Sequence, residues 1–220
     1  MTVDVIGSTD LIVYILPTSI QLSDSTGDYP SNDGISYLVE GDSRLYTCQV
    51  PDINPEATFS WTVGSQALTP DSNESVVDAD GLITSTSMAI LTATWSNHGE
   101  ILKCQATNKD DNPGISISVT LDVKVPPKSS AMSLLDSSGP LQDTADVIEE
   151  TVHTFTCRVL GTRPAPTIMW FLNNEVQTTT TPAPGAGNGL VNTSSDWTFT
   201  PERVNHRQMV KCEANTSDSE

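Results

Sequence analysis

Apolar and polar residues alternate along several short stretches of this chain, which is the pattern of half-buried β-strands. The longest such stretch covers residues 115–125, where isoleucine, valine or leucine occupies every second position. In two shorter stretches, Phe59, Trp61 and Val63, and then Ile168, Trp170 and Leu172, share one face of a predicted strand, and loops rich in glycine, proline, serine and aspartate separate the stretches. The pattern predicts an all-β protein.

Two copies of one cysteine and tryptophan pattern lie on these stretches. They are Cys48, Trp61 and Cys104, followed by Cys157, Trp170 and Cys212. The tryptophan follows the first cysteine at the same offset in both copies (61−48 = 13 and 170−157 = 13), and the offsets between the cysteines are nearly equal (104−48 = 56 and 212−157 = 55). This spacing is typical of the immunoglobulin sandwich, in which an inter-sheet disulfide packs against a buried tryptophan. We therefore predict two tandem immunoglobulin-like antiparallel β-sandwiches.

Zinc is the other interpretation of paired cysteines. Structural zinc sites need ligands two to four residues apart within each half. In this chain even the two nearest cysteines, Cys104 and Cys157, lie far apart in the sequence (157−104 = 53), and the histidines are single. We therefore expect disulfides, no metal and no cofactor. Crossed pairing would join the two copies, so we predict the bonds Cys48–Cys104 and Cys157–Cys212, with Trp61 and Trp170 packed on them. Such bonds persist outside the cell or in a secretory lumen.

The repeat also predicts the domain boundaries. One constant offset connects Pro17 to Pro126 and Trp61 to Trp170 (126−17 = 109 and 170−61 = 109). It predicts one domain over residues 16–125 and a second over 126–220, with residues 1–15 as a lead-in or the last strand of a preceding domain. The second domain ends soon after Cys212 (220−212 = 8), whereas the first continues much further from Cys104 to Val125 (125−104 = 21). We therefore expect domain 126–220 to lack its last strand.

Charge and hydropathy restrict the partners and the location. The chain holds 28 acidic and 10 basic residues, a formal net charge of −18, which argues against a nucleic-acid or anionic-membrane partner. Most of this negative charge lies in residues 1–125, which indicates either solubility or a basic protein partner. The longest apolar run, residues 11–16, is far shorter than the roughly 20 residues of a membrane span, and no signal-peptide pattern is present. We therefore expect a piece of a longer secreted or membrane-anchored chain.

The second copy resembles a family of adhesion proteins. Its segments "HTFTCRVLGTRPAPTIMWFLNNEV" and "SDWTFTPERVNHRQMVKCEA" are similar to the immunoglobulin domains of nephrin and the kirre-type adhesion proteins. The short spacing between the cysteines also leaves little room for the extra strands of variable-type domains, which favours the short, constant-like set. The resemblance implies recognition of a protein ligand at the cell surface, with another immunoglobulin-like domain and homophilic or head-to-tail self-association as options. It carries over no catalytic residues, so we expect no enzyme activity.

Three Asn-x-Ser/Thr sequences, at Asn73, Asn192 and Asn215, are candidate N-glycosylation sites. Two functions remain open at this point. One is a fragment of a receptor or adhesion ectodomain that binds through a sheet face or edge. The other is a soluble or surface immune-type recognition molecule that binds a microbial or host ligand through its loops.

Overall fold

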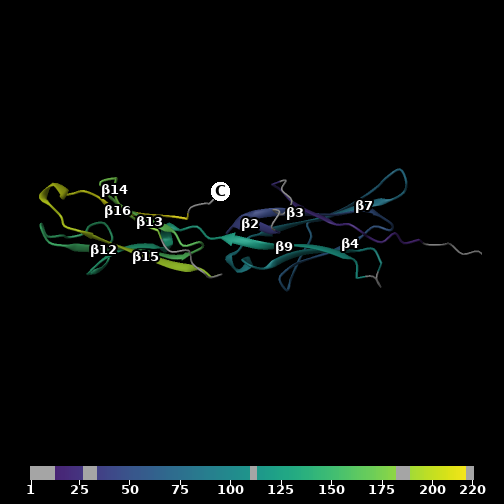
Figure 1. Ribbon diagram of the computed structural model, residues 1–220, viewed down its shortest axis with the longest axis horizontal. Helices are drawn as coiled ribbons and strands as arrows, with labels where there is room; N and C mark the ends of the chain where they lie inside the picture. Colours follow the sequence, from purple (N-terminus) through teal and green to yellow (C-terminus); the bar gives the residue numbers. More distant parts are fainter. Residues whose placement is uncertain (1–12, 27–33, 110–112, 182–188, 217–220) are drawn as a thin grey trace, which may run out of the picture. The chain divides into compact units, whose positions relative to one another are not determined.

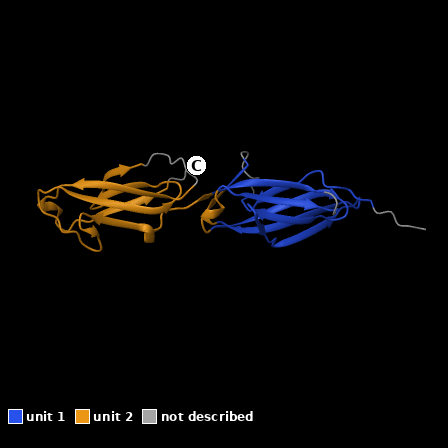
Figure 2. Cartoon of the chain, turned by 90° about the horizontal axis from the view of Figure 1, so that it is seen from below, with its two compact units in different colours: residues 1–36, 42–93, 99–122 blue, residues 37–41, 94–98, 123–220 orange. Residues whose placement is uncertain are grey.

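The computed structural model describes residues 13–26, 34–109, 113–181 and 189–216, and their regular structure consists of β-strands with three short 3₁₀ turns (Figure 1). The chain forms two compact units (Figure 2). The first contains residues 1–36, 42–93 and 99–122, and the second contains residues 37–41, 94–98 and 123–220. The predicted all-β fold with antiparallel sheets is confirmed. The boundaries proposed at residues 15/16 and 125/126 stay predictions.

The first sandwich consists of a four-stranded and a five-stranded sheet. The four-stranded sheet has the order β1-β3-β7-β6, with β1 at Gln21–Asp24, β3 at Ser43–Ile53, β7 at Ile83–Thr92 and β6 at Ser72–Val77. The five-stranded sheet has the order β2-β9-β8-β4-β5, with β2 at Ile35–Val39, β9 at Ile115–Lys124, β8 at Ile101–Thr107, β4 at Thr58–Val63 and β5 at Gln66–Leu68. The alternating residues 115–125 thus form a strand as predicted, and it pairs antiparallel with β8.

The second sandwich has a smaller set of strands. One sheet has the order β11-β10-β12-β15, with β11 at Gly139–Pro140, β10 at Met132–Asp136, β12 at His153–Thr162 and β15 at Val191–Phe199. The other has the order β14-β13-β16, with β14 at Glu175–Thr180, β13 at Thr167–Leu172 and β16 at Val210–Asn215. Within the described residues β16 pairs with β13 alone, whereas β8 lies between β4 and β9.

The core of the first sandwich is organised around one disulfide. Cys48 on β3 is bonded to Cys104 on β8, with their Cα atoms 6.6 Å apart, so the bond joins the two sheets. Trp61 lies directly opposite Cys104 in the register of β4 and β8 and is buried. Its indole Nε1 donates a hydrogen bond of 3.0 Å to the hydroxyl of Ser87 on β7. The ring therefore fills the space between the sheets while its polar N–H has an acceptor.

The second sandwich repeats this arrangement and adds aromatic rings. Cys157 on β12 is bonded to Cys212 on β16, with their Cα atoms 6.3 Å apart, and Trp170 lies opposite Cys212. The Trp170 indole donates to the hydroxyl of Ser195 at 3.0 Å. Trp197 on β15 packs between other rings, with ring centroids 5.6 Å from Trp170, 6.0 Å from Phe155 and 5.1 Å from Phe199. This cluster of aromatic rings forms part of the core of the second sandwich.

Candidate recognition surface

The outward face of the five-stranded sheet is a surface of mainly hydroxyl and amide side chains. On β4, β8 and β9 every second side chain points into the core, which leaves the alternate ones outside. The inward set includes Trp61, Leu102 and Leu121, which are buried. Eight members of the outward set, all at least partly exposed, are Ser60, Thr62, Ile101, Lys103, Gln105, Ser116, Ser118 and Thr120. We call these eight residues the hydroxyl face.

Strand register arranges the hydroxyl face in three rows across the sheet. The rows are Thr62, Lys103 and Ser118; then Ser60, Gln105 and Ser116; then Ile101 and Thr120. Lys103 is the single charged member of these eight, and the charged residues Asp122 and Lys124 follow Thr120 on the same side of β9, whereas the chain as a whole has a formal net charge of −18. The hydroxyl face therefore differs in charge from the chain average.

One end of the hydroxyl face opens into a shallow depression of about 420 Å³. Its lining consists of Thr62, Gly64, Gly99, Glu100, Ile101 and Lys103. The Glu100 carboxylate lies over Gly64, and a Cβ on that residue would come within 2.0 Å of Glu100 Oε2. Gly64, with a positive φ of +56°, thus lets the chain turn sharply while Glu100 packs against it. The depression offers one carboxylate and one ammonium group to a polar partner.

The candidate glycosylation sites lie on other sheets than the one that carries the hydroxyl face. Asn73 is exposed on β6, the edge strand of the opposite sheet, and Asn192 is exposed on β15, the last strand of its sheet in the second sandwich. Asn215 is exposed at the end of β16, and its sequon ends at residue 217, outside the described residues. None of the strands β2, β4, β5, β8 and β9 contains such a sequence. Among the described sheets, the five-stranded one therefore differs from the others in having no candidate glycan on its strands.

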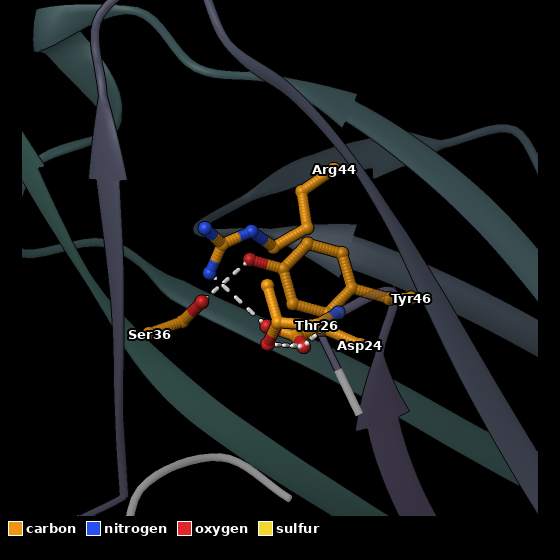
Figure 3. Close-up of polar contacts among 5 residues, drawn as sticks. All are labelled: Asp24, Thr26, Ser36, Arg44 and Tyr46. Carbon is orange, nitrogen blue, oxygen red and sulfur yellow. Dashed lines mark hydrogen bonds and ion pairs between the residues drawn. The ribbon is translucent and has the colours of Figure 1, made fainter. Parts of the chain in front are cut away.

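A polar cluster connects three strands of the first unit (Figure 3). An Arg44 guanidinium nitrogen lies 3.1 Å from Asp24 Oδ2, in a largely buried ion pair. The other oxygen of Asp24 accepts from the Thr26 amide at 2.9 Å and from the Thr26 hydroxyl. Beside them the hydroxyls of Tyr46 and Ser36 lie 2.7 Å apart. Because both Asp24 oxygens are engaged within the chain, this cluster holds strands together and offers no free ligand group.

Burial also changes the chemistry of Tyr46. Loss of solvent around the phenol raises the pKa of Tyr46 above 10.0, and this effect outweighs the opposite influence of the Ser36 hydrogen bond. A neutral phenol in this position can keep its hydrogen bond across the gap between β2 and β3. The cluster is therefore a cross-link between the two sheets over the physiological range of pH.

The described residues contain neither a metal cluster nor a membrane helix. In that part of the chain, no three side chains of the His, Cys, Asp and Glu types are placed to hold a metal ion together. No helix among the same residues has the length and apolar character that a membrane crossing requires.

Comparison with known proteins explains the repeated sandwich. The model of the CD80-like C2-set immunoglobulin domain family matches the chain twice, over residues 32–113 and 138–220. The chain belongs to this family. The predicted membership of the immunoglobulin superfamily, in its short, constant-like set, is therefore confirmed. Domains of this family are recognition modules without enzymatic activity, and their disulfides fit an extracellular or cell-surface location. No curated protein matches this chain significantly.

Solved structures with a similar fold are immunoglobulin-superfamily proteins. The structure of Rst D1-D2 is 21% identical, with a TM-score of 0.52 over 84% of this chain and 89% of that chain. The full ectodomain of mouse nectin-like molecule 4 is 20% identical, with a TM-score of 0.48 over 93% of this chain, which spans 62% of that chain. Bovine butyrophilin is 13% identical, with a TM-score of 0.42 over 90% of this chain and 92% of that chain. At these identities the likeness to Rst D1-D2 shows the fold alone.

The structure brings together the cysteines and tryptophans that the repeat singles out, one set in each sandwich. The three glycosylation candidates Asn73, Asn192 and Asn215 lie on three different strands, β6, β15 and β16. The sequence alone does not single out the serines that accept the indole hydrogen bonds, nor does it single out the members of the hydroxyl face. A signal for the serines exists, because Ser87 and Ser195 follow their tryptophans at nearly equal offsets (87−61 = 26 and 195−170 = 25).

Proposed function

We propose that this chain is an extracellular recognition module that binds a protein ligand through the hydroxyl face of its first sandwich. The observation that carries the proposal is that no strand of the sheet with this face contains a candidate N-glycosylation site. The other sheet of the same sandwich exposes Ile90 on β7, but its edge strand carries Asn73. A glycan there would shield that side of the sandwich and leave the five-stranded sheet accessible.

The chemistry of the hydroxyl face suits a protein surface. Hydroxyl and amide groups both donate and accept hydrogen bonds, so they can match either polarity on a partner. Their burial costs far less than burial of a charged group. The face is also open and broad, whereas small-molecule sites are concave and apolar. These features favour a second protein domain, including another immunoglobulin-like domain, as the ligand.

The proposal extends to the domain boundaries, the glycans and the source of the chain. We infer domains over residues 16–125 and 126–220, N-glycans at one or more of Asn73, Asn192 and Asn215, and a membrane-anchored receptor or adhesion protein as the source of the ectodomain. The alternative function, recognition of a microbial or host ligand through loops, has no specific observation in its favour. The segments 27–33, 110–112 and 182–188, on which it would depend, lie outside the described residues.

The test uses the glycosylated chain against an array of cell-surface immunoglobulin-superfamily ectodomains. Ser118→Arg places a long cation in the row of Thr62 and Lys103, and we expect it to weaken binding by at least about 10-fold, or about 1.4 kcal/mol. Gln21→Arg is the matched control, because Gln21 is exposed on β1 of the opposite sheet. Loss of binding in Gln21→Arg alone, or no binding to any ectodomain of the array, would contradict the proposal.

A further inference from the structure

A β-bulge in the second sandwich lies opposite one of the candidate glycosylation sites. The register of β12 and β15 shifts between Val159 and Thr162, so Leu160 and Gly161 both lie opposite Asn192. Gly161 has a φ of +67°, and its amide donates a hydrogen bond of 2.9 Å to Asn192 Oδ1. The Asn192 side chain therefore satisfies a backbone N–H that the bulge removes from the regular pairing of the strands.

This hydrogen bond is compatible with a sugar on Asn192. N-glycosylation joins Asn Nδ2 to the anomeric carbon of a lipid-linked oligosaccharide, while Nδ2 gives up one proton and the lipid pyrophosphate leaves. The oxygen Oδ1 takes no part in the new bond, so it can still accept from Gly161 after glycosylation. Asn192 is exposed on β15. A sugar attached there would therefore lie in solvent beside the bulge.

Exposed leucines flank this asparagine. Leu160 in the bulge is 44% exposed, and Leu190, two residues before Asn192, is 39% exposed. Strand side chains alternate between the two sides of a sheet, and Val159 is buried, so Leu160 lies on the outer side, as Asn192 does. The two leucines thus offer an apolar surface next to the point of attachment.

β15 is also an edge strand in the part of the chain that the structure describes. The order β11-β10-β12-β15 gives it one neighbour, β12. Exposed edges promote association between sheets, and proteins protect them with charges, prolines, bulges or a covering group. β15 contains one charged residue, Asp196, and its carboxylate accepts from the Thr156 hydroxyl at 2.7 Å. A bulky group on Asn192 would protect this edge.

The first sandwich has the same bulge without a glycosylation site. The register of β3 and β7 shifts in the same way. Thr84 there has the place of Asn192, three residues before the serine that accepts the indole hydrogen bond (87−84 = 3 and 195−192 = 3). Thr84 is paired with Val76 on β6, so β7 has a neighbour on each side. The comparison connects the site at Asn192 with the edge position of its strand rather than with the bulge alone.

We propose that Asn192 carries an N-glycan whose inner sugars cover Leu160 and Leu190 and stabilise β15 at the edge of the second sandwich. Sugar rings have apolar C–H faces that can pack on leucine, which removes apolar surface from water. The inference rests on the extracellular location and the glycosylation of the proposed function, and it gives one of the three candidate sites a structural role. The hydroxyl face lies on the other sandwich and takes no part in it.

Glycopeptide mapping of the chain secreted by cultured mammalian cells is the first test. It should find a glycan on Asn192. An unoccupied Asn192 overturns this proposal whatever the state of the other two sites. If Asn73 or Asn215 is occupied while Asn192 is not, the glycosylation inferred under the proposed function still holds. If all three are unoccupied, that part of the proposed function fails as well.

The second test measures what the glycan does. Ser194→Ala removes the glycosylation sequence but keeps the Asn192 side chain and its bond to Gly161. We expect it to lower the melting temperature of the second sandwich by at least about 2 °C and to speed hydrogen exchange in β12 and β15. Asn73→Gln is the matched control, because Asn73 also lies on an edge strand but in a regular ladder without a bulge. It should leave the second sandwich unchanged.

Two further comparisons isolate the leucine and the sugar. In a Leu160→Ser background, Ser194→Ala should cost less than half of what it costs in the wild type, because the glycan then has less apolar surface to cover. In chains made without glycosylation in an oxidising bacterial host, Ser194→Ala should change nothing. Equal costs in the two backgrounds, or the same cost without glycosylation, would overturn the proposal. Ser194→Ala should still bind the protein ligand, which separates this result from a failure of the hydroxyl face.

Discussion

At the scale of single residues, each sandwich core depends on a polar contact inside an apolar environment. Trp61 and Trp170 are buried, and each indole N–H donates to a serine on a strand of the opposite sheet. A buried donor without an acceptor costs about 1–3 kcal/mol, so these serines matter more to stability than their size indicates. In the second sandwich Ser195 also lies 2.7 Å from the hydroxyl of Thr180.

Replacing Ser87 with alanine should lower the free energy of unfolding by about 1–3 kcal/mol, because the Trp61 indole then has no acceptor. Urea denaturation followed by tryptophan fluorescence measures the change. Ser116→Ala is the control, because Ser116 is exposed on β9, and it should change stability by less than about 0.5 kcal/mol. Equal effects of the two substitutions would show that the hydrogen bond contributes little.

Tyr46 gives the first sandwich a sensitivity to alkaline pH. Its pKa is raised above 10.0 in the folded protein, so the folded state holds the phenol proton more tightly than the unfolded state does. The stabilisation is complete below about pH 10 and is lost as the pH rises through the folded pKa. Above about pH 10 the wild type should therefore lose stability more steeply than Tyr46→Phe, by up to about 1.4 kcal/mol per pH unit. Urea denaturation at several alkaline pH values measures this. The prediction is wrong if the free energy of unfolding falls with pH at the same slope in the wild type and in Tyr46→Phe.

The sequence predicts some of these residues and not others, for a physical reason. Cys48, Trp61 and their repeats stand out because cysteine and tryptophan are rare and their spacing reflects the distance across a sandwich. Ser87 is one serine among many, and its role depends on the register of β3 and β7, where it lies opposite Cys48. Register between strands that are distant in the sequence is set by packing of the whole core, which a single sequence does not display.

At the scale of secondary structure, strands with one buried face are the predictable ones. β9 and β4 show the alternation in sequence and the same alternation in burial. β6 has no such signal, since nearly all of its side chains are exposed and only its hydrogen bonds to β7 define it. Register shifts between Val50 and Ile53 and between Val159 and Thr162 are likewise absent from the sequence pattern. Packing and pairing of neighbouring strands determine these features.

Gly114, just before β9, is expected to tolerate no side chain. Its φ is +71°, and a Cβ there would lie 2.1 Å from the carbonyl oxygen of Ala106 on β8. Gly81 is the matched control, because its φ is +81° but a Cβ would meet nothing within 4 Å. Gly81→Ala should cost about 1–3 kcal/mol from the backbone conformation alone. Gly114→Ala should cost clearly more, as measured by urea denaturation, and an equal cost would show that the backbone of β8 and β9 can separate without penalty.

At the scale of the whole molecule, the sequence repeat accounts for two similar sandwiches but not for how the compact units divide. The constant offset predicts two equivalent copies, and the family match over residues 32–113 and 138–220 agrees with that duplication. It does not predict that residues 37–41 and 94–98 join the compact unit of residues 123–220. Within that unit the His98 ring contacts the Arg163 guanidinium, a contact between residues far apart in the sequence.

The two disulfides should act independently on the molecule, because each joins residues of one compact unit. They close loops of similar length, with sequence separations of 56 and 55, so chain entropy gives each a similar contribution of about 4 kcal/mol. The double variant Cys48→Ala and Cys104→Ala should lose about 2–5 kcal/mol in urea denaturation without reductant. Non-reducing peptide mapping of that variant should still recover the Cys157–Cys212 peptide in full. Recovery of a Cys48–Cys157 or Cys104–Cys212 peptide from the wild type would show that the pairing within each sandwich is incorrect, because such a bond would connect the two copies of the repeat.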